Sequence, residues 1–164
     1  MVTAPRRGSD TLDTETRTSD EDHLALRLWL RLLACTNRVE APLRQRLREQ
    51  FEGSLPRFDL MAQLERHPGG LRMNELSARL MVTGGNVTGL TDRLVAEGLV
   101  DKRTPSTDRR ACTVALTPAG RRQFAAMARA HESWLVELLG GLSTAQQKQL
   151  YELLGQLKTA LPAK

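Results

Sequence analysis

The sequence predicts a mainly α-helical protein with one small β-hairpin. Apolar residues recur at helical spacing on both sides of a central stretch, Met73–Gly120, and glycine or proline residues separate the runs. Within that stretch, Leu99–Arg103 and the alternating Cys112–Leu116 are predicted to be two short strands around a charged loop. No apolar run approaches about 18 residues, so no membrane-spanning helix is expected.

Length and charge limit the class of protein. At 164 residues, of which 40% are apolar, the chain is expected to form one compact unit with a real core. The net charge of +5 is uneven, because residues 1–22 contain three arginines and six acidic residues, whereas the remainder contains 21 basic and 13 acidic residues. A basic body fits a polyanionic partner, although a basic protein without such a partner would have the same composition.

The chain is predicted to have four segments. Residues 1–19 are polar, lack a signal-peptide pattern and are interpreted as a mobile arm of a soluble, cytoplasmic protein. Residues 20–52 and 118–164 are helical and carry more leucine than the segment between them can cover, which predicts a dimerisation region. Residues 53–117 form the central unit.

The helical pattern of residues 20–50 contains a proline. Its apolar stripe consists of Leu24, Leu28, Leu32, Val39, Leu43 and Leu47. Pro42 lies inside this run, so it is expected to kink the helix or to divide it near Arg38–Ala41. A second helix is predicted to begin around Pro56, to bury Leu60, Met61 and Leu64, and to end at His67–Gly70.

Two further helices are predicted after the hairpin. Thr117 and Pro118 are a helix cap and a first-turn proline, and Gly140 and Gly141 end that helix. Ser143 and Gln146 form a capping box for the last helix. Its apolar stripe consists of Leu150, Leu153, Leu154, Leu157 and Leu161.

The central stretch is predicted to contain two helices, at 73–80 and 85–97, joined by a tight turn. In the second of these helices, Val87, Leu90 and Leu94 share the buried face. The opposite face and its edges hold Gly85, Asn86, Thr88, Gly89, Asp92, Arg93 and Ala96. Each helical glycine costs about 0.5–1 kcal/mol relative to alanine. A bare face allows close approach to DNA bases and phosphates, but a surface helix that tolerates glycine is an equal interpretation.

The predicted hairpin favours the first interpretation. Its tip, Pro105–Arg110, is rich in turn-forming and cationic residues. A β-ribbon with arginines suits the minor groove, where negative potential is concentrated. Asp108 is unsuited to a DNA contact and is interpreted as a brace that pairs with an arginine and holds the tip rigid.

At this point the sequence resembles a known family. Asp108-Arg109-Arg110, followed after five residues by Leu116-Thr117-Pro118-Ala119-Gly120, is similar to the wing signature of the MarR (multiple antibiotic resistance regulator) family. The segment Asp92–Val100 matches the same family's pattern. The resemblance covers about residues 22–160. It implies a winged helix-turn-helix DNA-binding domain at 53–117, a helical dimerisation domain and binding to palindromic double-stranded DNA as a homodimer.

The resemblance also implies site residues by position. Asn86, Thr88, Gly89 and Arg93 would face the major groove, with Gly85 on the same face of the helix. Arg110 would enter the minor groove, Arg109 would flank it, and Asp108 would brace the wing. These positions are expectations that follow from the family's pattern.

The resemblance further implies a signal that releases DNA. Members of the family commonly respond to a small aromatic or phenolic ligand, or to an oxidant, at the junction between the two domains. The candidate ligand-binding residues are Trp29, Arg57, Phe58, Met61, Phe124, Met127, His131 and Trp134. For any one of them, a simple place in the core is the favoured interpretation. The segments Leu33–Glu40, Leu55–Met61 and Met81–Leu90 also resemble regulators of aromatic-acid catabolism, some of which respond to aryl-CoA thioesters, which implies a ligand-released repressor.

Other functions have less support in the sequence. No nucleophile–base pair, phosphate loop or metal-ligand spacing is found, so neither an enzyme nor a cofactor or metal site is expected. A winged helix used only for protein contacts is disfavoured by Arg109 and Arg110. Cys35 and Cys112 are interpreted as small buried hydrophobic residues, with a redox-sensing thiol as the alternative.

Overall fold

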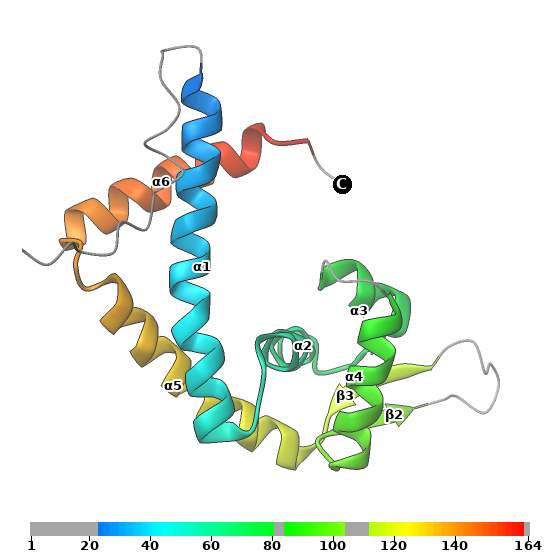
Figure 1. The fold of residues 1–164 in the computed structure, drawn as a ribbon. Coiled ribbons are helices and arrows are strands. Elements are labelled where there is room, and N and C mark those ends of the chain that lie inside the picture. The colour runs from blue at the N-terminus through cyan, green and yellow to red at the C-terminus, as the bar shows by residue number, and fades with distance from the viewer. Residues whose placement is uncertain (1–22, 81–83, 104–111, 163–164) are drawn as a thin grey trace, which may run out of the picture. The chain divides into compact units, whose positions relative to one another are not determined.

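The computed structural model describes residues 23–80, 84–103 and 112–162 (Figure 1). Most of these residues are helical, and a small antiparallel sheet lies in the central part of the chain, which confirms the predicted fold class. The elements are α1 (Leu24–Phe51), α2 (Leu55–Glu65), β1 (Leu71–Arg72), α3 (Met73–Arg79), α4 (Gly84–Ala96), β2 (Val100–Arg103), β3 (Thr113–Leu116), α5 (Pro118–Leu139) and α6 (Thr144–Ala160). The chain divides into two compact units, with the boundary between Pro42 and Leu43.

The first unit contains the N-terminal part of α1. This helix continues without interruption from Leu24 to Phe51, so the predicted division near Arg38–Ala41 is absent. A proline inside a helix removes one backbone hydrogen bond and costs about 3 kcal/mol, which the helical residues on both sides of Pro42 outweigh. Leu24, Leu28 and Trp29 are exposed. No helix in the described part of the chain is long and apolar enough to cross a membrane.

The core of the second unit surrounds α2. Ser54 caps this helix, its Oγ accepting a hydrogen bond from the backbone N–H of Arg57 at 3.4 Å, and Pro56 occupies the first turn. The fully buried large side chains are Leu47, Leu60, Met61, Leu64, Leu76, Val87, Leu94, Val114, Leu116 and Met127, together with Thr91. The helix contacts α3, α5 and β3. The predicted buried face of Leu60, Met61 and Leu64 is therefore confirmed.

The sheet has three antiparallel strands in the order β1–β3–β2. Val100 pairs with Leu116 and Arg103 with Thr113, which confirms the predicted hairpin. Strand β1, in which Leu71 pairs with Val114, was not predicted from the sequence. A two-residue strand has no alternation to reveal it, because its identity depends on a partner more than 40 positions away.

The first turn of α5 is joined to the segment that follows α4. Thr117 Oγ1 donates a hydrogen bond to the carbonyl oxygen of Gly98 at 2.7 Å and accepts one from the N–H of Gly120 at 3.0 Å. The N–H of Thr117 donates to the carbonyl oxygen of Leu99 at 3.0 Å. A Cβ atom at Gly120 would lie only 2.0 Å from that same oxygen. Threonine and glycine at this spacing thus allow α5 to start against the segment that follows α4.

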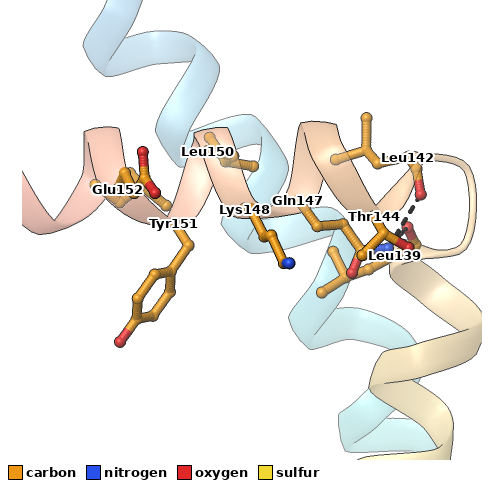
Figure 2. A pocket seen from close by; sticks show the side chains of 9 residues that line it. Leu139, Leu142, Thr144, Gln147, Lys148, Leu150, Tyr151 and Glu152 are labelled. Atoms are coloured by element: carbon orange, nitrogen blue, oxygen red, sulfur yellow. Dashed lines mark hydrogen bonds between the residues drawn. The ribbon is translucent and has the colours of Figure 1, made fainter.

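The last helix begins at the predicted capping box. Ser143 Oγ accepts a hydrogen bond from the N–H of Gln146, and Gln146 Oε1 accepts one from the N–H of Ser143. Gln147 Nε2 donates to the carbonyl oxygens of Leu139 and Leu142 at 3.1 and 3.0 Å, which ties α6 to the end of α5 (Figure 2). None of the residues of α6 is buried within the single chain.

Candidate nucleic-acid interface

Helix α4 is amphipathic and presents a mostly polar face to solvent. Val87 and Leu94 are fully buried, and Leu90 is half-buried. The residues that lie on the exposed face are Asn86, Thr88, Gly89, Asp92, Arg93 and Ala96. Thr91 is also buried, which was not predicted. Its Oγ1 donates a hydrogen bond to the carbonyl oxygen of Val87 at 2.8 Å, and this bond satisfies the buried hydroxyl without water. The period of the apolar residues alone does not reveal this threonine.

The exposed face of α4 is open at its centre. Apart from the backbone of the helix itself and the two neighbouring residues, no heavy atom of the described residues lies within 4 Å of the position that a Cβ atom would take at Gly89. Glycine is therefore not required there by packing within the chain or by backbone geometry. The space in front of Gly89 is accessible to a partner, and the amide and hydroxyl groups of Asn86 and Thr88 lie on the same face. Gly85 lies on the same helix, but the structure describes nothing of its surroundings.

Charged residues connect α4 with β2. Lys102 Nζ forms an ion pair with Asp92 Oδ1, so the one carboxylate on the exposed face of α4 has a cationic partner in the hairpin. Arg103 Nε lies 3.4 Å from Asp101 Oδ2 in the same strand. Both pairs are exposed, and such pairs contribute about 0–1 kcal/mol each. The expected wing residues Asp108, Arg109 and Arg110 lie outside the described residues.

Several of the candidate ligand-binding residues form an aromatic cluster between α2 and α5. The rings of Phe58 and His131 are stacked with centroids 4.4 Å apart, and Phe124 lies 5.4 Å from Phe58. Trp134 lies 6.5 Å from His131. Met61 of α2 and Met127 of α5 are fully buried core residues.

The remaining two candidates are placed elsewhere. Arg57 points to Glu97 at the end of α4, with which it forms an ion pair. Trp29 lies in the first unit and is 58% exposed. The structure thus brings four of the candidates together in an aromatic cluster and buries two more in the core. The role of the eight as ligand-binding residues stays a prediction.

Electrostatic interactions on α5 act on two titratable groups. Arg46 forms a two-armed ion pair with Glu137, with both N–O distances 2.7 Å, and its guanidinium lies 6.0 Å from the centre of the Trp134 ring. The hydrogen bond from Arg46 lowers the pKa of Glu137. Burial lowers the pKa of His131, although the nearby charge of Asp59 acts in the opposite direction.

The lowered pKa of His131 predicts a pH dependence of stability. Because the folded state binds the proton less tightly than the unfolded state, the free energy of unfolding should fall as the pH drops below about 6.5. His131→Phe keeps a ring against Phe58 but removes the titrating group, so it should reduce this fall. The measurement is urea unfolding of both proteins between about pH 7.5 and 5, above the range in which carboxylates such as Glu137 titrate. If the free energy of unfolding falls equally with pH in the two proteins, His131 is not the group responsible.

The two cysteines are less buried than the sequence predicted. Cys35 is exposed and Cys112 is half-buried, and both are free thiols. The expectation of a buried hydrophobic residue is wrong for Cys35, because this part of α1 exposes most of its side chains. In the described ranges, no three His, Cys, Asp or Glu side chains gather in a way that could hold a metal ion.

Comparisons with known proteins agree with this architecture. The sequence model of the MarR family matches residues 54–111. A MarR family transcriptional regulator from Silicibacter pomeroyi has 35% identity and a TM-score of 0.73, and the alignment covers 88% of this chain and all of that one. No curated protein matches the chain.

More distant structures share the fold. The regulator BldR from Sulfolobus solfataricus has 22% identity and a TM-score of 0.74, over 87% of this chain and all of that one. A MarR mutant from E. coli, crystallised with operator DNA, has 23% identity and a TM-score of 0.72, over 88% of this chain and all of that one. Taken with the 35% identity over the full length of the Silicibacter pomeroyi protein, these findings show that the chain belongs to the MarR family of DNA-binding transcriptional regulators, which are not enzymes.

Proposed function

We propose that the protein acts as a homodimer that reads a palindromic operator with α4 and the wing, and represses transcription until a small aromatic ligand releases it. The exposed face of α4 carries this proposal, because Asn86, Thr88 and Arg93 surround the open position at Gly89. Amide and guanidinium groups are the side chains that most often read base edges in the major groove. The E. coli MarR structure with operator DNA supports a DNA-bound state for this fold.

Three substitutions test the roles of helix and wing. Asn86 lies near the start of α4, so Asn86→Ala should relax base preference at the inner, major-groove positions of the operator. Arg110 is proposed to enter the minor groove, so Arg110→Ala should weaken binding by about 1–3 kcal/mol and relax preference only at the outer positions. Asp108→Ala should reproduce part of the Arg110→Ala effect. Each variant is titrated with operator variants at fixed salt, and equal weakening on every sequence would make Arg110 a phosphate contact only.

Salt dependence separates DNA binding from a role in protein contacts. A regulator that neutralises several phosphates loses DNA affinity steeply as salt rises. The logarithm of its association constant falls against the logarithm of the salt concentration with a slope of about −0.9 for each phosphate contact. The wild-type protein should show such a slope in a gel-shift titration from low to moderate salt. A winged helix used only to bind other proteins would show no DNA binding at any salt concentration in this range.

Gly89→Ala should change stability and DNA affinity in opposite directions. Alanine in a helix interior is favoured over glycine by about 0.5–1 kcal/mol, and the open space at this position accommodates a methyl group. The free energy of unfolding should therefore rise. If α4 lies against DNA at Gly89, the same methyl group should weaken operator binding. Unfolding in urea and a DNA titration of the same preparation measure both effects, and unchanged DNA affinity would place Gly89 away from the interface.

The unburied helices support a homodimer. α6 exposes Leu150, Leu153, Leu154 and Tyr151, the last of these 81% exposed. A groove of about 610 Å³ lies along the end of α5 and the start of α6, with Leu139, Leu142, Leu150 and Leu154 among its lining residues. Figure 2 shows Tyr151 projecting away from the helix. Monomeric proteins rarely expose such contiguous apolar surface, and a second copy is the proposed partner. In this scheme residues 20–52 and 118–164 form the dimerisation domain and residues 53–117 the DNA-binding domain.

The aromatic cluster supports a site for the effector close to α4. Phe58 and His131 belong to α2 and α5, and the residue before Phe58 contacts the end of α4. A flat ring that replaced part of this stacking would act directly on α2. A thermal-shift screen of phenolic acids and their CoA esters, followed by DNA release with any hit, tests this proposal. If a ligand raises the melting temperature of Phe58→Ala as much as that of the wild-type protein, the ligand binds elsewhere.

Exposure of Cys35 supports a second candidate signal. An exposed thiol is accessible to an oxidant, and the reactive form is the thiolate. We expect Cys35→Ser and Cys112→Ser to leave the response to the natural signal intact. Release of DNA by peroxide that disappears in Cys35→Ser would instead make the protein a redox-sensing regulator.

A further inference from the structure

Arg57 and Glu97 form a two-armed ion pair between α2 and the residue that follows α4. Arg57 Nη1 donates to Glu97 Oε1 at 2.8 Å, and Nη2 lies 2.5 Å from Oε2. The Arg57 side chain is only 12% exposed, whereas that of Glu97 is 42% exposed. The Nε atom of Arg57 is also buried and has no hydrogen-bond partner among the described residues. The negative charge of Glu97 thus compensates the positive charge of the nearly buried guanidinium.

Glu97 is rigidly connected to the last turn of α4. Its N–H donates to the carbonyl oxygen of Arg93 at 3.0 Å, and the N–H of Leu99 donates to that of Leu94 at 2.9 Å. Gly98 takes a left-handed conformation with φ of 72°, which is typical of a glycine that ends a helix. A displacement of Glu97 would therefore move the turn that carries Arg93, one of the proposed DNA contacts.

The other end of the ion pair lies on a fixed helix. Next to Arg57, Phe58 is stacked on His131 and packs against Phe124 of α5. Further along α2, Leu60 and Leu64 are fully buried. The contact of α4 with the hairpin through Asp92 and Lys102 is more exposed, with 56% and 37% of the two side chains accessible. Since exposed pairs contribute little, the Arg57–Glu97 pair is the stronger polar restraint of the two.

We infer that Arg57 is a positioning residue for DNA binding, which holds the C-terminal turn of α4 at a fixed angle by pairing with Glu97. This inference rests on the proposed function, in which α4 reads base edges. Neither Arg57 nor Glu97 contacts DNA in this scheme. The pair acts through the placement of α4, in the way that supporting residues fix the geometry of a binding site.

Glu97→Gln gives the sharpest test, because the loss of a charge and the loss of positioning predict opposite changes in DNA affinity. The substitution removes one negative charge from a protein that binds a polyanion, so electrostatics alone predicts tighter binding. Positioning predicts binding about tenfold weaker, the lower end of the range seen at metal sites when a residue that orients a ligand is removed. The probe is the duplex that the wild-type protein selects from a randomised pool, and an unrelated duplex of equal length measures non-specific binding. Non-specific affinity and the salt slope should not fall.

Matched variants complete the design. Glu132→Gln removes one exposed carboxylate from α5 and should leave binding to the selected duplex within about twofold of wild type, which is the ordinary range for a surface substitution. Arg57→Gln should weaken specific binding as Glu97→Gln does, and the exchange Arg57→Glu with Glu97→Arg should recover part of the loss. Circular dichroism establishes that each variant is folded. If Arg57→Gln does not fold, the half-exposed Glu97 still gives a decisive result.

Two failures are distinguishable. A wild-type protein that prefers no duplex would overturn the proposed function and this inference with it. A wild-type protein with a clear preference, together with folded Glu97→Gln that binds the selected duplex equally or more tightly, would overturn the inference alone.

Discussion

Gly120→Ala is expected to lower the free energy of unfolding by about 3 kcal/mol, the upper part of the range for overpacking a rigid site. The added Cβ atom would lie 2.0 Å from the carbonyl oxygen of Leu99 and 3.0 Å from its carbonyl carbon. Both are backbone atoms that no side-chain rotation can move. Leu99 is held because the next residue, Val100, pairs with Leu116 in the sheet. Relief therefore requires α5 to move away from the sheet, which breaks the hydrogen bonds of Thr117.

The measurement is urea unfolding of wild type and variant at one protein concentration. Gly89→Ala is the matched control, since it makes the same chemical change at a helical position with open space and should stabilise the fold. A Gly120→Ala protein as stable as wild type would mean that the close approach of α5 to Leu99 is not a rigid feature of the fold. It would also remove the physical reason for glycine at the end of the wing signature.

Leu150→Glu is expected to produce the largest loss of DNA affinity, about 100-fold or more, although Leu150 lies outside the proposed DNA-binding domain of residues 53–117. Leu150 lines the apolar groove at the start of α6, where the second copy is proposed to pack. A buried carboxylate without a partner would oppose association of the two chains. Two linked DNA-binding units gain roughly 10²–10⁴ in affinity over one, and a monomer forfeits that gain.

The control for this prediction carries the same charge change on the same helix. Gln156→Glu also adds one negative charge to α6 at an exposed position. Sedimentation should show wild type and Gln156→Glu as dimers and Leu150→Glu as a monomer, and only the monomer should lose affinity for DNA. A stable wild-type monomer at micromolar concentration would contradict the proposed assembly, and a Leu150→Glu dimer would place the interface elsewhere.

Local rules of sequence predicted a large part of the fold. The caps at Thr117 and Ser143 form as expected, because a capping side chain interacts with backbone groups two or three residues away. The exposed and buried faces of α4 followed from the spacing of Val87 and Leu94, since helical geometry determines which residues share a face.

Features that depend on distant partners were not predictable from the same rules. Strand β1 exists because Leu71 meets Val114, and the Arg57–Glu97 pair joins residues 40 positions apart. No local pattern indicates that Glu97 pairs with Arg57, and the role of Arg57 as a ligand-binding residue stays a prediction. The expected alternative in which Pro42 divides α1 is absent, because a local rule cannot weigh one lost hydrogen bond against the helical residues on either side.

Selection of duplexes from a randomised pool by the wild-type protein tests the central proposal most directly. Two copies of α4 in a two-fold dimer should enrich palindromic sites whose half-sites are one DNA turn apart, about 10–10.5 base pairs between centres, or a multiple of that spacing. Repeating the selection with Asn86→Ala should yield sites with relaxed inner positions and the same spacing. Enrichment of a single unsymmetrical site, or no enrichment at moderate salt, would contradict sequence-specific binding by a dimer through α4.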